Sequence, residues 1–180
     1  KKAEAYNDKN AEILEMIAGK QQVECPSASK RLGVLVTFGQ SNSANHAGYR
    51  VQINEVSDVI NYHNGNCYKA SSPLLGATGI KGEWMSLIAQ LLVDKRLYDK
   101  VIIISLGIGG SPVAAWADTG IHNSRLIANL KQISTTYNVT DMLWHQGETD
   151  LMSGVGASNY LMSFASMVSS IRTIGVKAPI

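Results

Sequence analysis

A serine follows directly on an apolar run in the stretch VLVTFGQSNSANHAG, residues 34–48. The strand-forming residues stop at Gly39, and Gln40, Ser41 and Asn42 come next. A serine in this position commonly forms a turn or caps a helix. Its hydroxyl can also attack a carbonyl carbon, provided that a base takes its proton and that hydrogen-bond donors hold the resulting oxyanion. A nucleophilic serine therefore requires such donors and a base elsewhere in the sequence.

Two later segments carry groups of the required kinds. GIGGS follows the apolar run KVIIISL, and HQGETD follows VTDMLW. Gly109 or Gly110 can bring a backbone N–H close to a ligand because a glycine has no Cβ. The N–H of Ser41 would be unpaired at the start of a helix, and Gln146 adds a side-chain amide. The predicted oxyanion donors are therefore Ser41, Gly109, Gly110 and Gln146.

The order of strands and helices predicts how these segments meet. Continuous apolar runs predict buried strands, and apolar residues at helical spacing predict amphipathic helices between them. Strands alternating with helices favour a parallel sheet with helices on both faces. The predicted strands are RLGVLVTFG, KVIIISLG, VTDMLW and a beginning VKAPI; the predicted helices lie within 3–20, from Glu83 onward, and within 124–137 and 159–175. The carboxyl ends of parallel strands share one edge, so the three polar segments should converge there.

Two local patterns add detail to this plan. Asn64-Gly65 predicts a hairpin turn inside a loop-rich region, residues 49–79, that we expect over one edge of the sheet. In the helix after Glu83, the apolar residues are spaced to line one buried face. They are Trp84, Leu87, Ile88, Leu91 and Leu92.

Composition limits the possible partners. The chain has 180 residues, a net charge of +2, 45% hydrophobic and 17% charged residues, which is typical of one globular domain with a real core. It has no basic stripe and no apolar run near the about 18 residues of a membrane span, so we expect neither nucleic acid nor a membrane as partner. Cys25 and Cys67 lack zinc-ligand spacing and are either a disulfide or two thiols. A disulfide and a carbohydrate substrate would favour a secreted or periplasmic protein.

Three motifs resemble those of a known family. FGQSN, GGS with the downstream Trp116, and WHQGETD are similar to three blocks of the SGNH (GDSL-like) hydrolases. The similarity is greatest to the branch of sialate O-acetylesterases and family 6 acetylxylan esterases, and it runs from about Gly33 to Ile180. It implies an SGNH hydrolase domain over 33–180 after an N-terminal helix and lead-in over 1–32. The implied fold is a flavodoxin-like, three-layer α/β/α sandwich with a parallel sheet.

The resemblance also implies a chemistry. A serine esterase of this kind removes O-acetyl groups from carbohydrate through an acyl-serine intermediate, without a metal or an organic cofactor. Ser41 would be the nucleophile, and the oxyanion donors would be the Ser41 N–H, a glycine of the second block and Gln146. Acetylated carbohydrate is the expected substrate.

The general base is where the chain departs from the family pattern. The family supplies a histidine from a late Asp-x-x-His block, and none of His46, His63, His122 or His145 has that setting. We expect the domain to be C-terminally incomplete at Ile180, with the histidine supplied by a further segment or a second chain. The 180 residues alone are then expected to be inactive or nearly so. His46 is a weaker candidate for the base, and His145 is expected to be a buried, hydrogen-bonded support of the rim.

Several residues keep two interpretations at this stage. The triad acid is either Glu148 or an aspartate of the missing block; alternatively, Glu148 and Asp150 cap the helix that follows. Asn42 either ties the nucleophile turn to neighbouring backbone or touches substrate. Trp116 and Trp84 either stack on a sugar or belong to the core.

The function itself also has alternatives. The same donors and nucleophile would serve another SGNH acyl hydrolase or an acyltransferase. A non-catalytic carbohydrate-binding or scaffold module could keep the fold without the base.

Overall fold

The computed structural model describes residues 12–13, 17–53 and 58–180. Most of the helix predicted within residues 3–20 lies outside this described part. Residues 18 and 19 form a turn, and Cys25 is joined to Cys67 by a disulfide, which settles the choice left open by the sequence. This bond ties the lead-in to the strand that contains Cys67.

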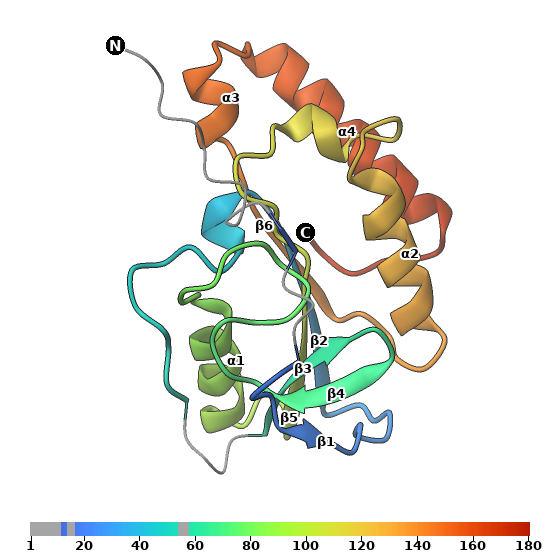
Figure 1. The fold of residues 1–180 in the computed structure, drawn as a ribbon. Coiled ribbons are helices and arrows are strands. Elements are labelled where there is room, and N and C mark those ends of the chain that lie inside the picture. The colour runs from blue at the N-terminus through green and yellow to red at the C-terminus, as the bar shows by residue number, and fades with distance from the viewer. Residues whose placement is uncertain (1–11, 14–16, 54–57) are drawn as a thin grey trace.

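A mostly parallel sheet forms the centre of the molecule (Figure 1). Among the described residues, six strands have the order β1-β4-β3-β5-β2-β6. β2 pairs in parallel with β5 and β6, and β5 pairs in parallel with β3, whereas β4 and β1 add antiparallel pairs at one edge. The strands are β1 (Gln22–Val23), β2 (Leu32–Gly39), β3 (Val59–His63), β4 (Asn66–Lys69), β5 (Lys100–Ser105) and β6 (Asp141–His145).

Helices lie on both faces of this sheet, as the alternation of elements predicted. α1 packs on one face, and α2 and α4 pack on the other (Figure 1). The helices are α1 (Met85–Asp94), α2 (Asn123–Ser134), α3 (Glu148–Met152) and α4 (Ala157–Thr173), with 3-10 turns η2 (Ser41–Ser43) and η3 (Val113–Trp116). The α/β class with a mostly parallel sheet is therefore confirmed.

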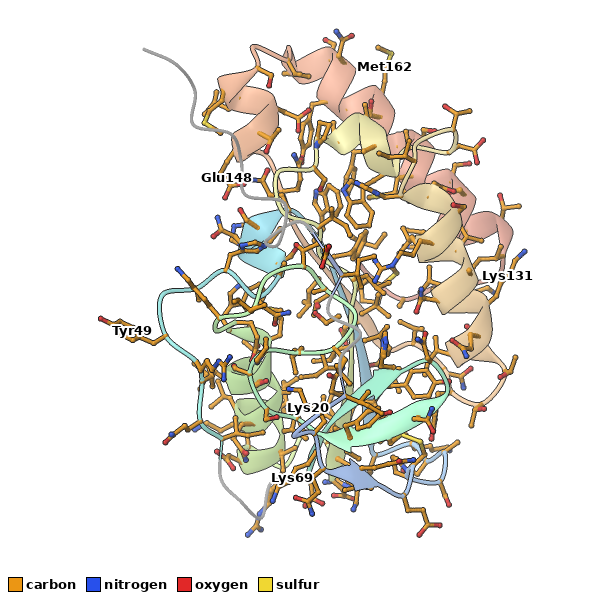
Figure 2. The ribbon with its side chains drawn as sticks, in the orientation of Figure 1. Lys20, Tyr49, Lys69, Lys131, Glu148 and Met162 are labelled. Carbon is orange, nitrogen blue, oxygen red and sulfur yellow. A yellow bond between two sulfur atoms is a disulfide. The ribbon has the colours of Figure 1, made fainter. Side chains whose placement is uncertain are left out.

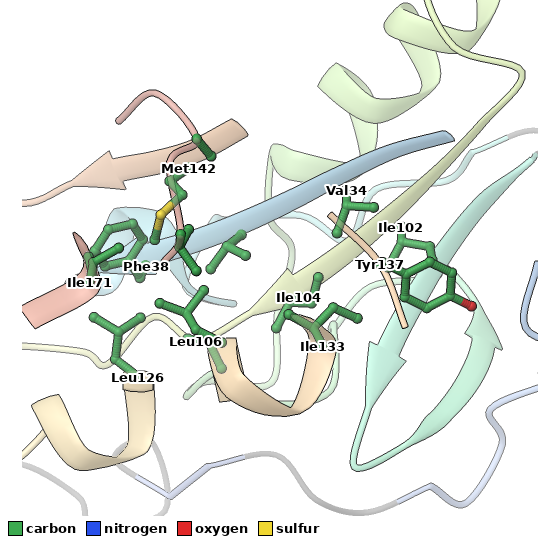
Figure 3. Close-up of a cluster of buried hydrophobic side chains, with 14 of the residues drawn as sticks. Val34, Phe38, Ile102, Ile104, Leu106, Leu126, Ile133, Tyr137, Met142 and Ile171 are labelled. Atoms are coloured by element: carbon green, nitrogen blue, oxygen red, sulfur yellow. The ribbon is translucent and has the colours of Figure 1, made fainter. Parts of the chain in front are cut away.

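The core is built from the two faces of β2 and β5. Every residue of β2 is buried, which explains its continuous apolar sequence. Val34 and Phe38 point toward α2 and α4, together with Leu126 of α2 and Ile171 of α4 (Figure 3). Leu35 points to the opposite face, which α1 covers. This two-sided burial fixes the position of the carboxyl end of β2.

The buried face of α1 differs from the prediction. Met85, Ser86 and Ala89 are buried, whereas Leu87 and Leu91 are 53% and 54% exposed. The reason lies at the start of the helix, where the buried Glu83 carboxylate accepts hydrogen bonds from the Ser86 N–H and hydroxyl at 2.8 and 2.7 Å. This contact sets the rotation of α1 about its own axis and therefore its buried face. Helical periodicity alone did not indicate that rotation.

The segment before α1 is more regular than expected. The predicted hairpin turn is present, with φ of 48° at Asn64 and 82° at Gly65 between β3 and β4. However, β3 also pairs with β5 inside the sheet, so this region is not only a loop layer over the edge. At the other edge, Met142 N–H donates to Pro179 O at 2.9 Å, so residues 176–180 run beside β6 without forming an assigned strand.

Candidate active site

The three polar segments meet at Gly39, as the sheet topology predicted. Ile108 N–H donates to Gly39 O at 2.9 Å, and Gln40 N–H donates to His145 O at 3.0 Å. Gly39 has φ of 124°, and a Cβ there would lie 2.2 Å from the His145 oxygen. Only glycine fits this approach, which brings the ends of β2, β5 and β6 together.

Ser41 begins the 3-10 turn η2 immediately after this junction. The turn is closed by Ser43 N–H to Gln40 O at 2.9 Å and by Ala44 N–H to Ser41 O at 3.0 Å. Within the part of the chain that the structure describes, neither the hydroxyl nor the N–H of Ser41 has a hydrogen-bond partner. Ser41 is partly buried. It therefore presents a free hydroxyl and a free backbone donor at the rim.

The second segment lies against this turn. A Cβ on Gly107 would come within 2.3 Å of Ser43 O, so the loop after β5 is in direct contact with η2. Ser111 N–H closes a turn onto Ile108 O at 3.3 Å, and Gly110 has φ of 70° within it. The positive φ explains why glycine stands at this position.

The backbone N–H groups of the two glycines of this turn differ in their hydrogen bonding. Gly109 N–H donates to the Thr78 hydroxyl at 2.7 Å, so in this structure it is not free to hold an oxyanion. Gly110 N–H has no partner among the described residues, and Gly110 is exposed. The sequence could not choose between Gly109 and Gly110; the geometry leaves Gly110 as the available donor.

Gln146 does not have the position expected of an oxyanion donor. Its Nε2 donates to Gln40 Oε1 and Ser111 O, both at 3.1 Å, and to the Asp150 carboxylate. A side-chain amide has two hydrogens, so three acceptors leave none for a ligand. Gln146 instead ties together the three segments of the rim.

The start of α3 is capped by Gln40, the residue that follows β2. Gln40 Oε1 accepts hydrogen bonds from Gly147 N–H at 3.2 Å and Thr149 N–H at 3.1 Å. Glu148 and Asp150 both stand in the first turn of α3, as the capping alternative expects, but the N-cap is Gly147 and makes no side-chain cap hydrogen bond. A local sequence signal for the Gln40 cap does not exist, because its partners lie more than 100 residues away in the chain.

Asp150 has a structural position under the rim. Its side chain is 2% exposed, and its carboxylate accepts the Val113 N–H at 2.9 Å in addition to the Gln146 amide. It therefore connects α3 with η3. The structural interpretation of Asp150 agrees with these contacts.

Glu148 is the first residue of α3, and its side chain is 43% exposed (Figure 2). Its Oε1 accepts a hydrogen bond from the Asn42 side-chain amide and lies 3.6 Å from His145 Nε2. Its Oε2 is buried without a hydrogen-bond partner in the described part of the chain. Asn42 O in turn accepts the Trp84 indole N–H at 2.5 Å. A carboxylate with one unpaired oxygen thus stands next to the residue that follows Ser41.

Two other expectations need correction. Trp116 is fully buried, with its ring edge against Phe38 and its indole N–H on the Ser111 hydroxyl at 2.9 Å, so it cannot stack on a sugar in this structure. The His145 side chain is 48% exposed, not buried, and its ring lies 6.1 Å from that of Trp84. Trp84 is thus the tryptophan that borders the open side of the rim.

The remaining histidine near the site, His46, is half-buried. His46 Nε2 lies 3.0 Å from the Thr78 hydroxyl. Burial, and to a lesser degree the nearby Lys81 charge, lowers the pKa of His46. Thr78 therefore contacts both His46 and Gly109, a role that sequence reasoning missed because the T-G pair in ATG carries no signal for it.

The described residues hold no cluster of three metal-binding side chains. None of their helices has the length and apolar character needed to cross a bilayer.

Comparison with known proteins identifies the family. Residues 31–175 match the model of the SASA family, described as carbohydrate esterase, sialic acid-specific acetylesterase. The X-ray structure of an Arabidopsis thaliana protein is similar in fold, with a TM-score of 0.52 and 12% sequence identity, over 83% of this chain and 84% of that chain. No curated protein sequence matches the chain significantly. Since the family model covers most of the sequence, including all three rim segments, the chain belongs to the SASA family of carbohydrate esterases.

Proposed function

We propose that this protein is a serine esterase that removes O-acetyl groups from carbohydrate, of the sialic acid or xylan type, through an acyl-serine intermediate. The family assignment supports an acetylesterase acting on carbohydrate. The observation that carries the mechanism concerns Ser41 and Gly110, in the segments that follow neighbouring strands: among the described residues, neither their N–H groups nor the Ser41 hydroxyl has a hydrogen-bond partner. An acetyl ester needs this combination of nucleophile and oxyanion donors.

The reaction would proceed in two steps. Ser41 Oγ attacks the acetyl carbonyl carbon while a base takes its proton, and the two N–H groups stabilise the oxyanion. The tetrahedral intermediate collapses, the sugar hydroxyl leaves with a proton, and acetyl-Ser41 remains. Water then attacks the acyl-serine by the same route and releases acetate.

For the base, we propose a histidine of an Asp-x-x-His segment, supplied by sequence after Ile180 or by a second chain. The half-exposed Glu148 carboxylate would accept its second N–H and so orient the ring. His145 is the competing base, because it is half-exposed and lies 3.6 Å from the same carboxylate. His145→Gln separates the two: a loss of under about tenfold in kcat favours the external histidine, and a loss of a thousandfold or more favours His145.

The Cys25–Cys67 disulfide supports a place of action outside the reducing cytoplasm. We therefore propose a secreted or periplasmic protein.

The function is tested with the natural full-length protein on O-acetylated sialic acid, acetylated xylan and p-nitrophenyl acetate. We expect acetate release from at least one of the two acetylated carbohydrates. Ser41→Ala should lower kcat by about a thousandfold or more, while Ser153→Ala, at an exposed serine, changes nothing. Turnover of p-nitrophenyl acetate without either carbohydrate would favour another acyl hydrolase or an acyltransferase. Carbohydrate binding without any turnover would favour a binding module.

A further inference from the structure

Thr78 links two parts of the rim that the sequence keeps far apart. Its side chain is fully buried, and its hydroxyl accepts the Gly109 N–H at 2.7 Å. Its backbone N–H donates to Gly107 O at 3.0 Å, and its backbone oxygen accepts the Asn45 N–H at 2.9 Å. One residue therefore fastens the loop after β5 to the segment that follows Ser41.

The hydroxyl of Thr78 has a second partner, His46. His46 Nε2 lies 3.0 Å from it, so the oxygen interacts with both the Gly109 amide and the imidazole. The neighbouring backbone is close-packed as well, because a Cβ at Gly79 would come within 2.4 Å of Asn45 O. The position of this hydroxyl is thus fixed from several sides.

The turn that Thr78 holds has a peptide that can adopt two orientations. Positive φ at the third residue of a four-residue turn is the mark of a type II turn, and rotation of the central peptide interconverts types I and II. In the turn from Ile108 to Ser111, that central peptide carries the Gly110 N–H. Glycine at both central positions lets the backbone rotate freely. The Gly109 N–H has the same direction in both turn types, so its contact with Thr78 does not select one of them. Together with the Thr78 N–H on Gly107 O, the contact instead fixes where the turn lies relative to the segment that follows Ser41.

We propose that Thr78 is a positioning residue for the oxyanion loop: its buried hydroxyl holds Gly109 N–H and so keeps the turn that carries the Gly110 N–H in place relative to Ser41. This inference rests on the proposed esterase function. It also explains why the loop uses two consecutive glycines, one for the contact with Thr78 and one for the free donor.

The test compares Thr78→Val, which removes the hydroxyl at nearly constant volume, with Thr78→Ser, which keeps it. The readouts are kcat and KM of the full-length protein on p-nitrophenyl acetate and the exchange rate of the Gly109 amide hydrogen. We expect Thr78→Val to lower kcat by about ten- to a hundredfold with KM within about twofold, since a misdirected donor loses part of its effect on the transition state. Gly109 exchange should become faster. Thr78→Ser should keep kcat within about threefold of the wild type.

Thr37→Val is the matched control, because Thr37 is equally buried at the end of β2 but its hydroxyl has no partner among the described residues. It should leave kcat and Gly109 exchange unchanged. Ser41→Ala, measured in parallel, separates two failures. If it keeps activity, the esterase mechanism fails and the role of Thr78 in it fails as well. If Ser41→Ala is inactive but Thr78→Val has wild-type kcat, or if Thr78→Ser loses as much as Thr78→Val, the inference about Thr78 alone is overturned.

Discussion

The two halves of the rim around Ser41 differ in how their polar groups are used. The buried half consists of Gln40, Ser111, Gln146 and Asp150, and within it the Ser111 hydroxyl and the Gln146 amide donate to acceptors of the protein. The open half consists of Asn42, Trp84, His145 and Glu148, whose imidazole and carboxylate side chains are 48% and 43% exposed. Ser41 follows Gln40 and precedes Asn42, and among the described residues its hydroxyl and N–H have no hydrogen-bond partner.

This difference separates a structural role from a role in the reaction, which the sequence alone does not distinguish. Gln146 and Glu148 are only two residues apart, and in each one buried side-chain oxygen has no hydrogen-bond partner among the described residues. They differ because the Gln146 amide has no hydrogen left to donate, whereas the Glu148 carboxylate is 43% exposed. Engaged donors fix geometry, while exposed polar groups are what a substrate or a reacting residue can bind. The buried half should therefore contribute mainly to stability, and the open half mainly to rate.

The largest effect that tests this contrast is expected at Glu148. Glu148→Gln removes the charge that would stabilise an imidazolium, so we expect kcat to fall by about a hundredfold to ten-thousandfold with little change in the free energy of unfolding. Kinetics and chemical denaturation of the same variant measure both. Glu24→Gln, at an exposed glutamate, is the control and should match the wild type. Full activity of Glu148→Gln would mean that the carboxylate of the open half takes no part in the reaction.

The opposite pattern is expected at Asp150. Asp150→Ala leaves the Val113 N–H and the Gln146 amide without their acceptor in a buried site, which should cost about 3 kcal/mol of unfolding free energy. Asp118→Ala, at an exposed aspartate, should change the stability by less than about 0.5 kcal/mol. If denaturation showed equal stability for both variants, the buried half would not be the structural half.

Much of the fold could be predicted because its signals are local. The continuous apolar sequence of β2 and the Asn64-Gly65 turn each identify their element without knowledge of the rest. β3 was harder, because VINYH is short and mixes polar with apolar residues, and its place beside β5 is decided by pairing. The rotation of α1 likewise depends on the buried contact between Glu83 and Ser86.

The site was predictable in its location but not in the role of each residue. Sheet topology places Ser41, Gly110 and Glu148 at one edge from the sequence alone. Whether a given amide is free depends on partners far away in the chain, as with Thr78 for Gly109 and Gln40 for α3. Burial also depends on residues far away in the chain. Trp116 is buried in the core and His145 is half-exposed, and neither could be decided from the local sequence.

The smallest expected effect concerns the dependence of stability on pH. Burial lowers the pKa of His46, with a smaller contribution from Lys81, and also the pKa of His122, with a smaller contribution from Arg125. The folded protein then binds fewer protons than the unfolded chain once the pH falls below the ordinary histidine value of 6.5. The free energy of unfolding should therefore decrease as the pH falls through 6.5.

The variant His46→Gln/His122→Gln should show a flatter profile between pH 7.5 and about 5, measured by denaturation at each pH. An unchanged slope would mean that neither imidazole is kept neutral by the fold. Neither histidine belongs to the two halves of the rim. A change in the pH profile of activity in this variant therefore measures the part of that profile that comes from protein stability.

Covalent labelling shows directly whether Ser41 is the nucleophile. The full-length protein is treated with a fluorophosphonate, which forms a stable adduct with an activated serine, and the modified peptide is identified by mass spectrometry. We predict one adduct, on Ser41, with a rate that falls in Glu148→Gln and with no labelling in Ser41→Ala. An adduct on another serine, or equal labelling of Ser41→Ala, would mean that Ser41 is not the nucleophile.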